Sequence, residues 1–218
     1  MRTDVWQSLH ADLEPGPQPD GETYAAPFGP NRAVLLPIRA LPSDDGRGVA
    51  SLILNQASFT VLNALCDDVA GRLAPHAPDV IVGMPTLGLP LAEGVARRLG
   101  HSRLVPLGTS RKFWYEDALS VPLASITTPG GGRSLYLDPR MRPLLDGARV
   151  AVVDDVLSTG RSIAAVLALL RLVDAAPVAI SAAMLQGLGW RATVGDVPVT
   201  GALATPILMR GPDGWQTA

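Results

Sequence analysis

Two adjacent carboxylates, Asp154 and Asp155, stand beside a run of hydroxyls, and no other stretch is as well suited to chemistry. The β-branched run before them, Val150–Val153, is typical of a strand buried on both faces, with the acids where it ends. The loop after them, Ser158–Ser162, opens a segment with helical apolar spacing. Because the first N–H groups of a helix lack partners, this loop suits a phosphate, and the carboxylates suit hydroxyls or hydrated Mg²⁺. Together they describe a site for a sugar phosphate.

Each half of this pattern also has a structural interpretation. Ser158 and Thr159 could cap a helix, and two aspartates after a strand could form a solvated turn. The two halves occurring together, from Val150 to Ser162, are much less expected by chance than either half alone. It is not a P-loop, because no Gly-Lys-Ser/Thr follows, and it is not Gly-x-Gly-x-x-Gly.

The stretch resembles the phosphoribosyl-diphosphate (PRPP) binding motif of type I phosphoribosyltransferases, which has a hydrophobic strand, two acids and small residues with Thr-Gly. The resemblance implies that Asp154 and Asp155 bind the ribose hydroxyls and Mg²⁺, directly or through water, and that Asp155 belongs to the catalytic groups. It also implies a 5′-phosphate loop made of Ser158, Thr159, Gly160, Arg161 and Ser162.

A second strand, loop and helix follow the same plan earlier in the chain. The apolar strand 79–83 leads into a small-residue loop, and we expect a helix from Pro90 to Gly100. Alone, most such loops are ordinary connections. Beside the first motif, this one resembles the family's pyrophosphate loop, in which backbone amides hold the leaving diphosphate. The residues that this assigns are Met84, Pro85, Thr86, Leu87 and Gly88.

A long stretch from Thr109 to Gly132 is predicted to be a functional lid. Arg111 and Lys112 supply cations for the diphosphate, and both are predicted to be catalytic. Three aromatic residues follow, 113–115, which could cover the site, form a dimer contact or simply pack. The adenine and orotate members of the family enter such a loop through Arg-Lys, so the resemblance points to that branch.

The composition indicates a folded protein, with 47% hydrophobic and 17% charged residues among 218. A net charge of −2 argues against a nucleic-acid surface. The single cysteine, Cys66, excludes an intramolecular disulfide framework and fits a reducing cytosol. We find no signal region and no apolar run of membrane-spanning length, so we expect a cytoplasmic protein without membrane contact.

Alternating strands and helices between Ser58 and Leu185 predict an α/β fold, a parallel sheet with helices on both faces. Residues 1–50 should form an N-terminal arm, irregular through residue 30, that is part of a hood over the sheet. Residues 51–189 should form the PRPP-binding core, which includes the lid 109–132. Residues 190–218 should form a C-terminal segment of the hood. Within the arm, Pro37 predicts an edge strand over Arg32–Leu41.

The resemblance implies a homodimeric enzyme that uses Mg²⁺ and transfers the phosphoribosyl group of PRPP to a nucleobase, releasing diphosphate. A purine is the favoured acceptor. The other hypothesis is a PRPP- or nucleotide-binding regulator of the same fold without turnover.

Overall fold

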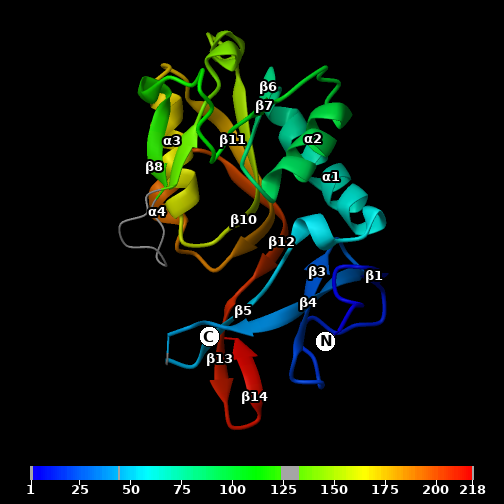
Figure 1. Ribbon diagram of the computed structural model, residues 1–218. Helices are drawn as coiled ribbons and strands as arrows, with labels where there is room; N and C mark the ends of the chain where they lie inside the picture. The colour runs from blue at the N-terminus through cyan, green and yellow to red at the C-terminus, as the bar shows by residue number, and fades with distance from the viewer. Residues whose placement is uncertain (1, 44, 124–132, 218) are drawn as a thin grey trace.

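A parallel sheet of five strands forms the centre of the protein, whose computed structural model describes residues 2–43, 45–123 and 133–217. The strand order is β12–β11–β10–β6–β7, and Figure 1 labels each of these strands. The strands are β6 (Val80–Gly83), β7 (Val105–Pro106), β10 (Val150–Leu157), β11 (Pro177–Gln186) and β12 (Val199–Thr205). Runs of Val, Ile and Ala make the three central strands apolar on both faces, as a sheet covered by helices requires.

Helices cover both faces of this sheet, which confirms the predicted fold class. On one face, α1 (Phe59–Leu73) and α2 (Gly88–Arg98) pack with Ala151 and Val153 of β10. On the other, α3 (Arg161–Arg171) packs with Val150 and Val152. Successive strand residues point to opposite faces, so one apolar run supplies both cores. The Ser58 hydroxyl accepts a hydrogen bond from the Val61 N–H and begins α1 as expected.

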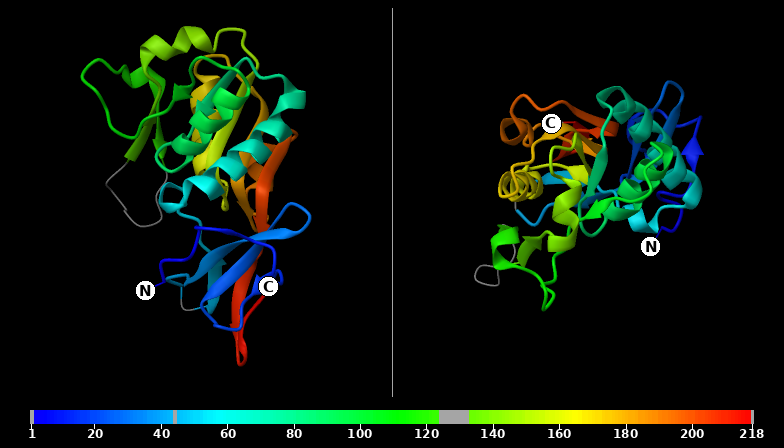
Figure 2. Two further views of the ribbon diagram at one scale, coloured as in Figure 1. Left: turned by 90° about the vertical axis from the view of Figure 1, so that its right-hand side faces the viewer. Right: turned by 90° about the horizontal axis from the view of Figure 1, so that it is seen from above.

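Residues from both ends of the chain form a second, antiparallel sheet, the hood. Figures 1 and 2 show the hood beyond the end of the core at which β12 runs on into β13. The strand order is β14–β13–β5–β4–β3–β2, with β1 also beside β4. These strands are β1 (Leu9–His10), β2 (Gly16–Pro17), β3 (Thr23–Phe28), β4 (Arg32–Ala40), β5 (Arg47–Ala50), β13 (Ile207–Gly211) and β14 (Gly214–Thr217).

The prediction of an edge strand at Pro37 was wrong. Strand β4 is central: it pairs with β3 on one side and with β1 and then β5 on the other. On that other side β1 pairs with residues 33–34 and β5 with residues 38–40, so Pro37 lies between the two pairings. The missing N–H therefore breaks no ladder bond. The arm is also less irregular than expected, because β3 lies inside it.

The C-terminal segment is divided between the two sheets. Strand β12, expected within the hood segment 190–218, pairs in parallel with β11 in the core sheet. Only β13 and β14 belong to the hood, where β13 pairs with β5. The hood is thus closed by strands from opposite ends of the sequence.

The remaining elements are short. Strands β8 (Ser120–Leu123) and β9 (Arg133–Tyr136) form a hairpin whose leucines pack with the core face that α3 covers. The short helical turns are η1 (Leu54–Gln56), η2 (Ala74–His76), η3 (Asp117–Leu119), η4 (Pro139–Leu144) and α4 (Arg191–Val194). None of the helices in the described ranges has the length and apolar character needed to cross a bilayer.

Candidate functional site

The acidic pair lies on β10, within the strand and not at its end as predicted. Strand β10 pairs with β6 only as far as Val153, opposite Gly83, but pairs with β11 as far as Leu157. Asp154 and Asp155 therefore lie where β10 loses one neighbour and keeps the other. The loop that follows β6 takes the place of that neighbour at the carboxyl edge of the sheet, which is where ligands bind in open α/β folds.

The two carboxylates have different surroundings. Asp154 is buried, with 4% of its surface exposed, and its Oδ1 accepts a hydrogen bond of 2.8 Å from the Asp155 N–H. A Cβ at Gly88 would lie 2.9 Å from that oxygen, so glycine leaves room for the carboxylate. Burial and, next, the charge of Asp155 raise the pKa of Asp154 well above its usual range. Asp155 is only partly buried and is the carboxylate more open to a ligand.

We expect Asp154→Asn to unfold at a higher temperature than the wild type at pH 7. The pKa of Asp154 is raised in the folded protein, so the stability that its protonation contributes is complete below the ordinary carboxyl pKa and is lost as pH rises through the folded pKa. An amide cannot ionise and keeps an oxygen for the Asp155 N–H. The gain should be about 2–4 °C, the shift that roughly 1 kcal/mol produces in a chain of this size.

Thermal unfolding from pH 3 to pH 8 measures this effect, and the gain should vanish at the acid end. Asp146→Asn is the control, because that carboxylate is exposed and should give no such trend. An unchanged or lower unfolding temperature of Asp154→Asn at pH 7 would contradict the argument.

The hydroxyl-rich loop leads from β10 into α3 and is shaped by a glycine. Gly160 precedes the helix with φ of 85°, in the left-handed region, and no side chain caps the first turn. The capping interpretation of the two hydroxyls is therefore wrong, and the first-turn amides are left for a ligand. Thr159, Arg161 and Ser162 are exposed around them. The Ser158 hydroxyl instead donates to Gln186 Oε1 at 3.1 Å.

The second predicted loop, residues 84–87, lies directly beside the acidic pair. It follows β6 and enters α2, which begins at Gly88 and not at Pro90 as expected. The Met84 N–H donates to the Val153 carbonyl at 3.0 Å, and Gly88 faces Asp154. The Met84 side chain is buried in the core, so it offers no contact to a ligand, whereas Thr86 is exposed. The peptide bond between Pro85 and Thr86 is cis.

The predicted lid, residues 109–132, contains β8, which pairs with β9 just after the lid; its residues 124–132 lie outside the described residues. Within its first part, Arg111 forms an ion pair with Asp117 at 3.0 Å, both side chains being largely exposed. Lys112 is exposed and has no acidic partner among the described residues. The structure therefore ties one of the two predicted cations to its own loop. Placement of either cation beside the acidic pair stays a prediction.

The aromatic residues of this segment have different surroundings. Phe113 is 96% exposed, while the Trp114 indole N–H donates to Asp138 at 3.2 Å. The rings of Tyr115 and Tyr136 lie 5.8 Å apart, which fixes the base of the segment against β9. Contacts therefore hold Trp114, which is still 43% exposed, and Tyr115, whereas Phe113 is almost fully exposed.

Sequence reasoning missed one buried residue of the site, Gln186, at the end of β11. Its Oε1 accepts the hydrogen bond from Ser158, and its Nε2 donates to the Ala50 carbonyl of the hood at 2.8 Å. Only 7% of its surface is exposed. A polar residue closing an apolar strand was the signal, but its two partners are distant in sequence. We call this contact the Gln186 bridge.

Comparison with known proteins agrees with this geometry. Residues 50–194 match the sequence model of the family described as "Phosphoribosyl transferase domain". The chain is 34% identical over 151 residues to the adenine phosphoribosyltransferase of Nocardia farcinica, covering 63% of this chain and 71% of that one. It is 32% identical over 155 residues to the "Bifunctional protein PyrR" of Mycobacterium tuberculosis, covering 68% and 70%.

Solved structures share the fold. The adenine phosphoribosyltransferase of Thermoanaerobacter pseudethanolicus superposes with a TM-score of 0.61 at 23% identity, over 77% of this chain and 95% of that one. The APRTase of Giardia lamblia in complex with 9-deazaadenine superposes with a TM-score of 0.59 at 17% identity, over 88% of this chain and 98% of that one. With the family match over most of the chain, these similarities show that the chain belongs to the phosphoribosyl transferase domain family, in the adenine-like branch of its type I members.

Proposed function

We propose that the protein transfers the phosphoribosyl group of PRPP to a nucleobase, a purine by preference, and releases diphosphate. The observation that supports this most is the meeting of two loops and an acidic pair at one edge of the sheet. The hydrogen bond from Met84 to Val153 and the contact of Gly88 with Asp154 hold the loop of residues 84–87 against the pair. The phosphate loop continues from the same strand. Such a site can hold both ends of one sugar phosphate.

The residues of this chain then have distinct roles in the reaction. Asp155, which is partly exposed, accepts hydrogen bonds from the ribose hydroxyls, and buried Asp154 fixes its backbone through the 2.8 Å contact. The first turn of α3 binds the 5′-phosphate with its amides. Backbone groups of residues 84–88 bind the diphosphate. Lys112 approaches it as charge develops on the leaving group.

Magnesium fits this donor set. Carboxylate oxygens are preferred ligands of Mg²⁺, which usually keeps several waters and takes further oxygens from substrate phosphates. Within residues 2–43, 45–123 and 133–217, no cluster of three or more His, Cys, Asp or Glu could hold a metal without substrate. Asp155, which is partly exposed, would therefore share the ion with PRPP, directly or through water, with buried Asp154 behind it. Bound Mg²⁺ would neutralise charge on the diphosphate.

The names of two relatives bear on the identity of the acceptor. The 34% identical relative is named an adenine phosphoribosyltransferase, which favours a purine. Another relative is named a bifunctional protein, so a PRPP- or nucleotide-binding regulator of the same fold is the second candidate. The homodimer and the cytoplasmic location expected from the sequence stay predictions.

Diphosphate release from PRPP with Mg²⁺ and a panel of free bases tests the proposal. We expect release with a purine base and formation of its nucleoside monophosphate. The double variant Asp154→Asn, Asp155→Asn should weaken binding of Mg-PRPP by about 2 kcal/mol or more, roughly two charge-assisted hydrogen bonds. Calorimetry with a folded double variant measures this, and Asp146→Asn is the matched control. PRPP binding without diphosphate release for any base would favour the regulator instead.

A further inference from the structure

The Gln186 bridge ties the hydroxyl-rich loop 158–162 to the rest of the protein. Among the residues that the structure describes, the hydrogen bond of 3.1 Å from the Ser158 hydroxyl to Gln186 Oε1 is the only one that a side chain of this loop makes. No side chain caps the first turn of α3, and Gly160, which has φ of 85°, precedes that turn. The position of the loop therefore depends on this one side-chain bond and on backbone contacts.

The backbone contacts of the loop are made by the turn 187–190, which directly follows β11. A Cβ at Gly189 would lie 3.1 Å from the Ser158 carbonyl oxygen, and a Cβ at Gly160 would lie 3.1 Å from the Trp190 Cα. The two glycines thus allow the two backbones to approach each other closely. Since the turn and the bridge both start from the end of β11, that end of the strand supports the loop through both backbone and side chain.

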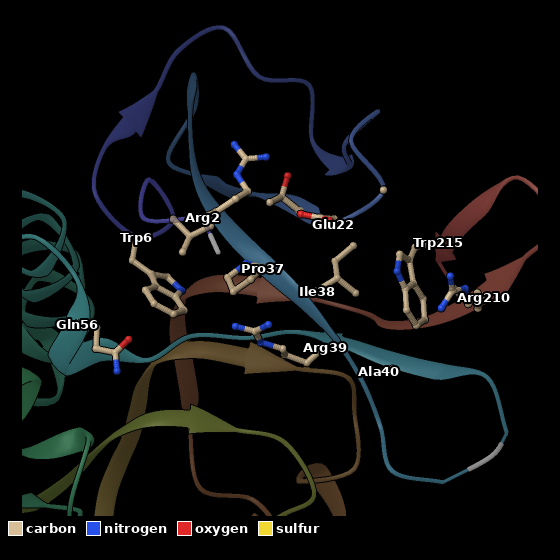
Figure 3. A pocket seen from close by; sticks show the side chains of 13 residues that line it. Arg2, Trp6, Glu22, Pro37, Ile38, Arg39, Ala40, Gln56, Arg210 and Trp215 are labelled. Atoms are coloured by element: carbon tan, nitrogen blue, oxygen red, sulfur yellow. The ribbon is translucent and has the colours of Figure 1, made fainter.

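The other end of the bridge is anchored in the hood. Gln186 Nε2 donates to the carbonyl of Ala50, a buried residue of β5, at 2.8 Å. The next residue, Ser51, donates its N–H to the Pro37 carbonyl at 2.8 Å and accepts the Trp6 indole N–H at 2.9 Å. Figure 3 shows Trp6 and Pro37 among the residues that line a hood cavity of about 490 Å³. The Ala50 carbonyl is therefore a fixed acceptor for the Gln186 amide.

Both polar atoms of the Gln186 side chain are engaged in this way. Because Nε2 faces the Ala50 carbonyl, Oε1 faces Ser158, and the Ser158 hydroxyl must donate its proton to it. A hydroxyl has one proton, so Ser158 has none left for the oxygens of an ionised phosphate, which only accept hydrogen bonds. The exposed Thr159 and Ser162 hydroxyls and the first-turn amides of α3 are left to bind an anion.

From these contacts we propose that Gln186 is a positioning residue of the phosphate site. It holds the loop through Ser158 so that the first-turn amides of α3 point to the 5′-phosphate. Gln186 acts through Ser158 and not on the ligand, because its amide is engaged at both ends and only 7% of its surface is exposed. The inference rests on the proposed function for the identity of that ligand.

Two small probes, titrated separately into the full chain, test the proposal. Ribose 5-phosphate reports on the phosphate loop and the acidic pair, and diphosphate with Mg²⁺ reports on residues 84–88. Gln186→Met keeps the length of the side chain and removes both hydrogen bonds. It should weaken ribose 5-phosphate binding about tenfold, roughly the effect of one hydrogen bond, and leave diphosphate binding unchanged. Calorimetry measures both affinities, and equal weakening of the two would overturn the proposal.

Ser181→Ala is the matched control for this variant. The Ser181 hydroxyl is buried and lies 2.9 Å from Thr200 Oγ1, so the variant loses a hydrogen bond between β11 and β12 away from the loop. It should change the affinity for neither probe. In steady-state kinetics with PRPP, Gln186→Met should raise KM and leave kcat nearly unchanged, because the phosphate is bound equally in the ground state and the transition state.

Ser158→Ala separates positioning from direct contact with the ligand. It removes the loop end of the bridge and leaves the Gln186 contact with Ala50. Ribose 5-phosphate binding should weaken about as much as in Gln186→Met, and the double variant should bind no more weakly than either single variant. Additive losses would show that Ser158 acts on the phosphate by itself and would overturn the proposal.

Hydrogen exchange of the ligand-free protein gives a measurement that does not depend on the proposed function. The Ala164 N–H donates to the Gly160 carbonyl at 2.9 Å and reports on the start of α3. Ser158→Ala should raise its exchange rate about tenfold and leave that of the Met84 amide unchanged. Unchanged exchange at Ala164 would overturn the proposal, also where Gln186→Met does not fold. A wild type that binds neither ribose 5-phosphate nor PRPP would count against the transferase, and exchange at Ala164 would still decide the positioning role.

Discussion

Gly160→Ala should abolish PRPP binding and also destabilise the protein. Gly160 adopts φ of 85°, which is strained for alanine, and a Cβ there would clash with Thr193 Oγ1 and lie 3.1 Å from the Trp190 Cα. The backbone at Trp190 cannot yield as a flexible side chain would, so the loop must move and the first-turn amides of α3 lose their position. We expect at least a hundredfold weaker Mg-PRPP binding and a loss of about 1–3 kcal/mol in unfolding free energy.

A matched variant separates backbone strain from loss of the site. Gly100 has φ of 82°, and a Cβ there meets nothing within 4 Å. Gly100→Ala should therefore bear a similar backbone cost and leave PRPP binding unchanged. Calorimetry and chemical denaturation of both variants measure the two effects. Wild-type PRPP affinity in Gly160→Ala would refute the assignment of this loop to the phosphate.

Lys112→Ala should lower kcat by about a hundredfold while weakening PRPP binding far less. If diphosphate is the leaving group, its charge grows in the transition state, and a cation that reaches it then stabilises that state more than bound PRPP. Lys112 is exposed and lacks an acidic partner among the described residues, so it can move to the ligand. Steady-state kinetics measure the change in kcat, and calorimetry measures the change in PRPP affinity.

Arg111→Ala is the informative comparison, because Arg111 is already paired with Asp117 at 3.0 Å. If that pair persists in the closed enzyme, the loss in kcat should be clearly smaller than for Lys112→Ala. Equal losses of kcat and PRPP affinity in Lys112→Ala would contradict the transition-state role. Recovery of activity on mixing Lys112→Ala with Asp154→Asn, Asp155→Asn would indicate that the lid serves a neighbouring subunit in a dimer.

The core could be predicted well from the sequence because its strands, helices and acidic motif each show in a short, contiguous stretch. The apolar run at Val150, the acids and the hydroxyl loop are contiguous, and the helices on both faces follow from 3.6-residue spacing. The loop of residues 84–87 could be assigned a function only because the acidic motif was predicted to lie beside it in the sheet. These features depend on short stretches of sequence and on the general rule that parallel strands align their carboxyl ends.

Features that depend on pairing between distant segments were not predictable in the same way. Pro37 suggested an edge strand because proline cannot donate a ladder hydrogen bond. In the folded chain β1 and β5 pair with β4 on either side of Pro37, so no such bond is needed there. The role of Gln186 depends on Ser158 and Ala50, which approach it only in the folded chain. Asp154 is also more buried than Asp155 because Gly88, at the start of α2, packs against it, and this contact exists only in the folded chain.

The Gln186 bridge limits how far sequence changes in the hood can disturb the core. Its contact with the hood is the main-chain carbonyl of Ala50, and a main-chain oxygen is present whatever side chain occupies that position. Side-chain substitutions in the hood can therefore leave the hydrogen bond between Gln186 and the Ala50 carbonyl in place. The hood sequence can therefore vary residue by residue without loss of this link to the core, provided that Gln186 and Ser158 are kept.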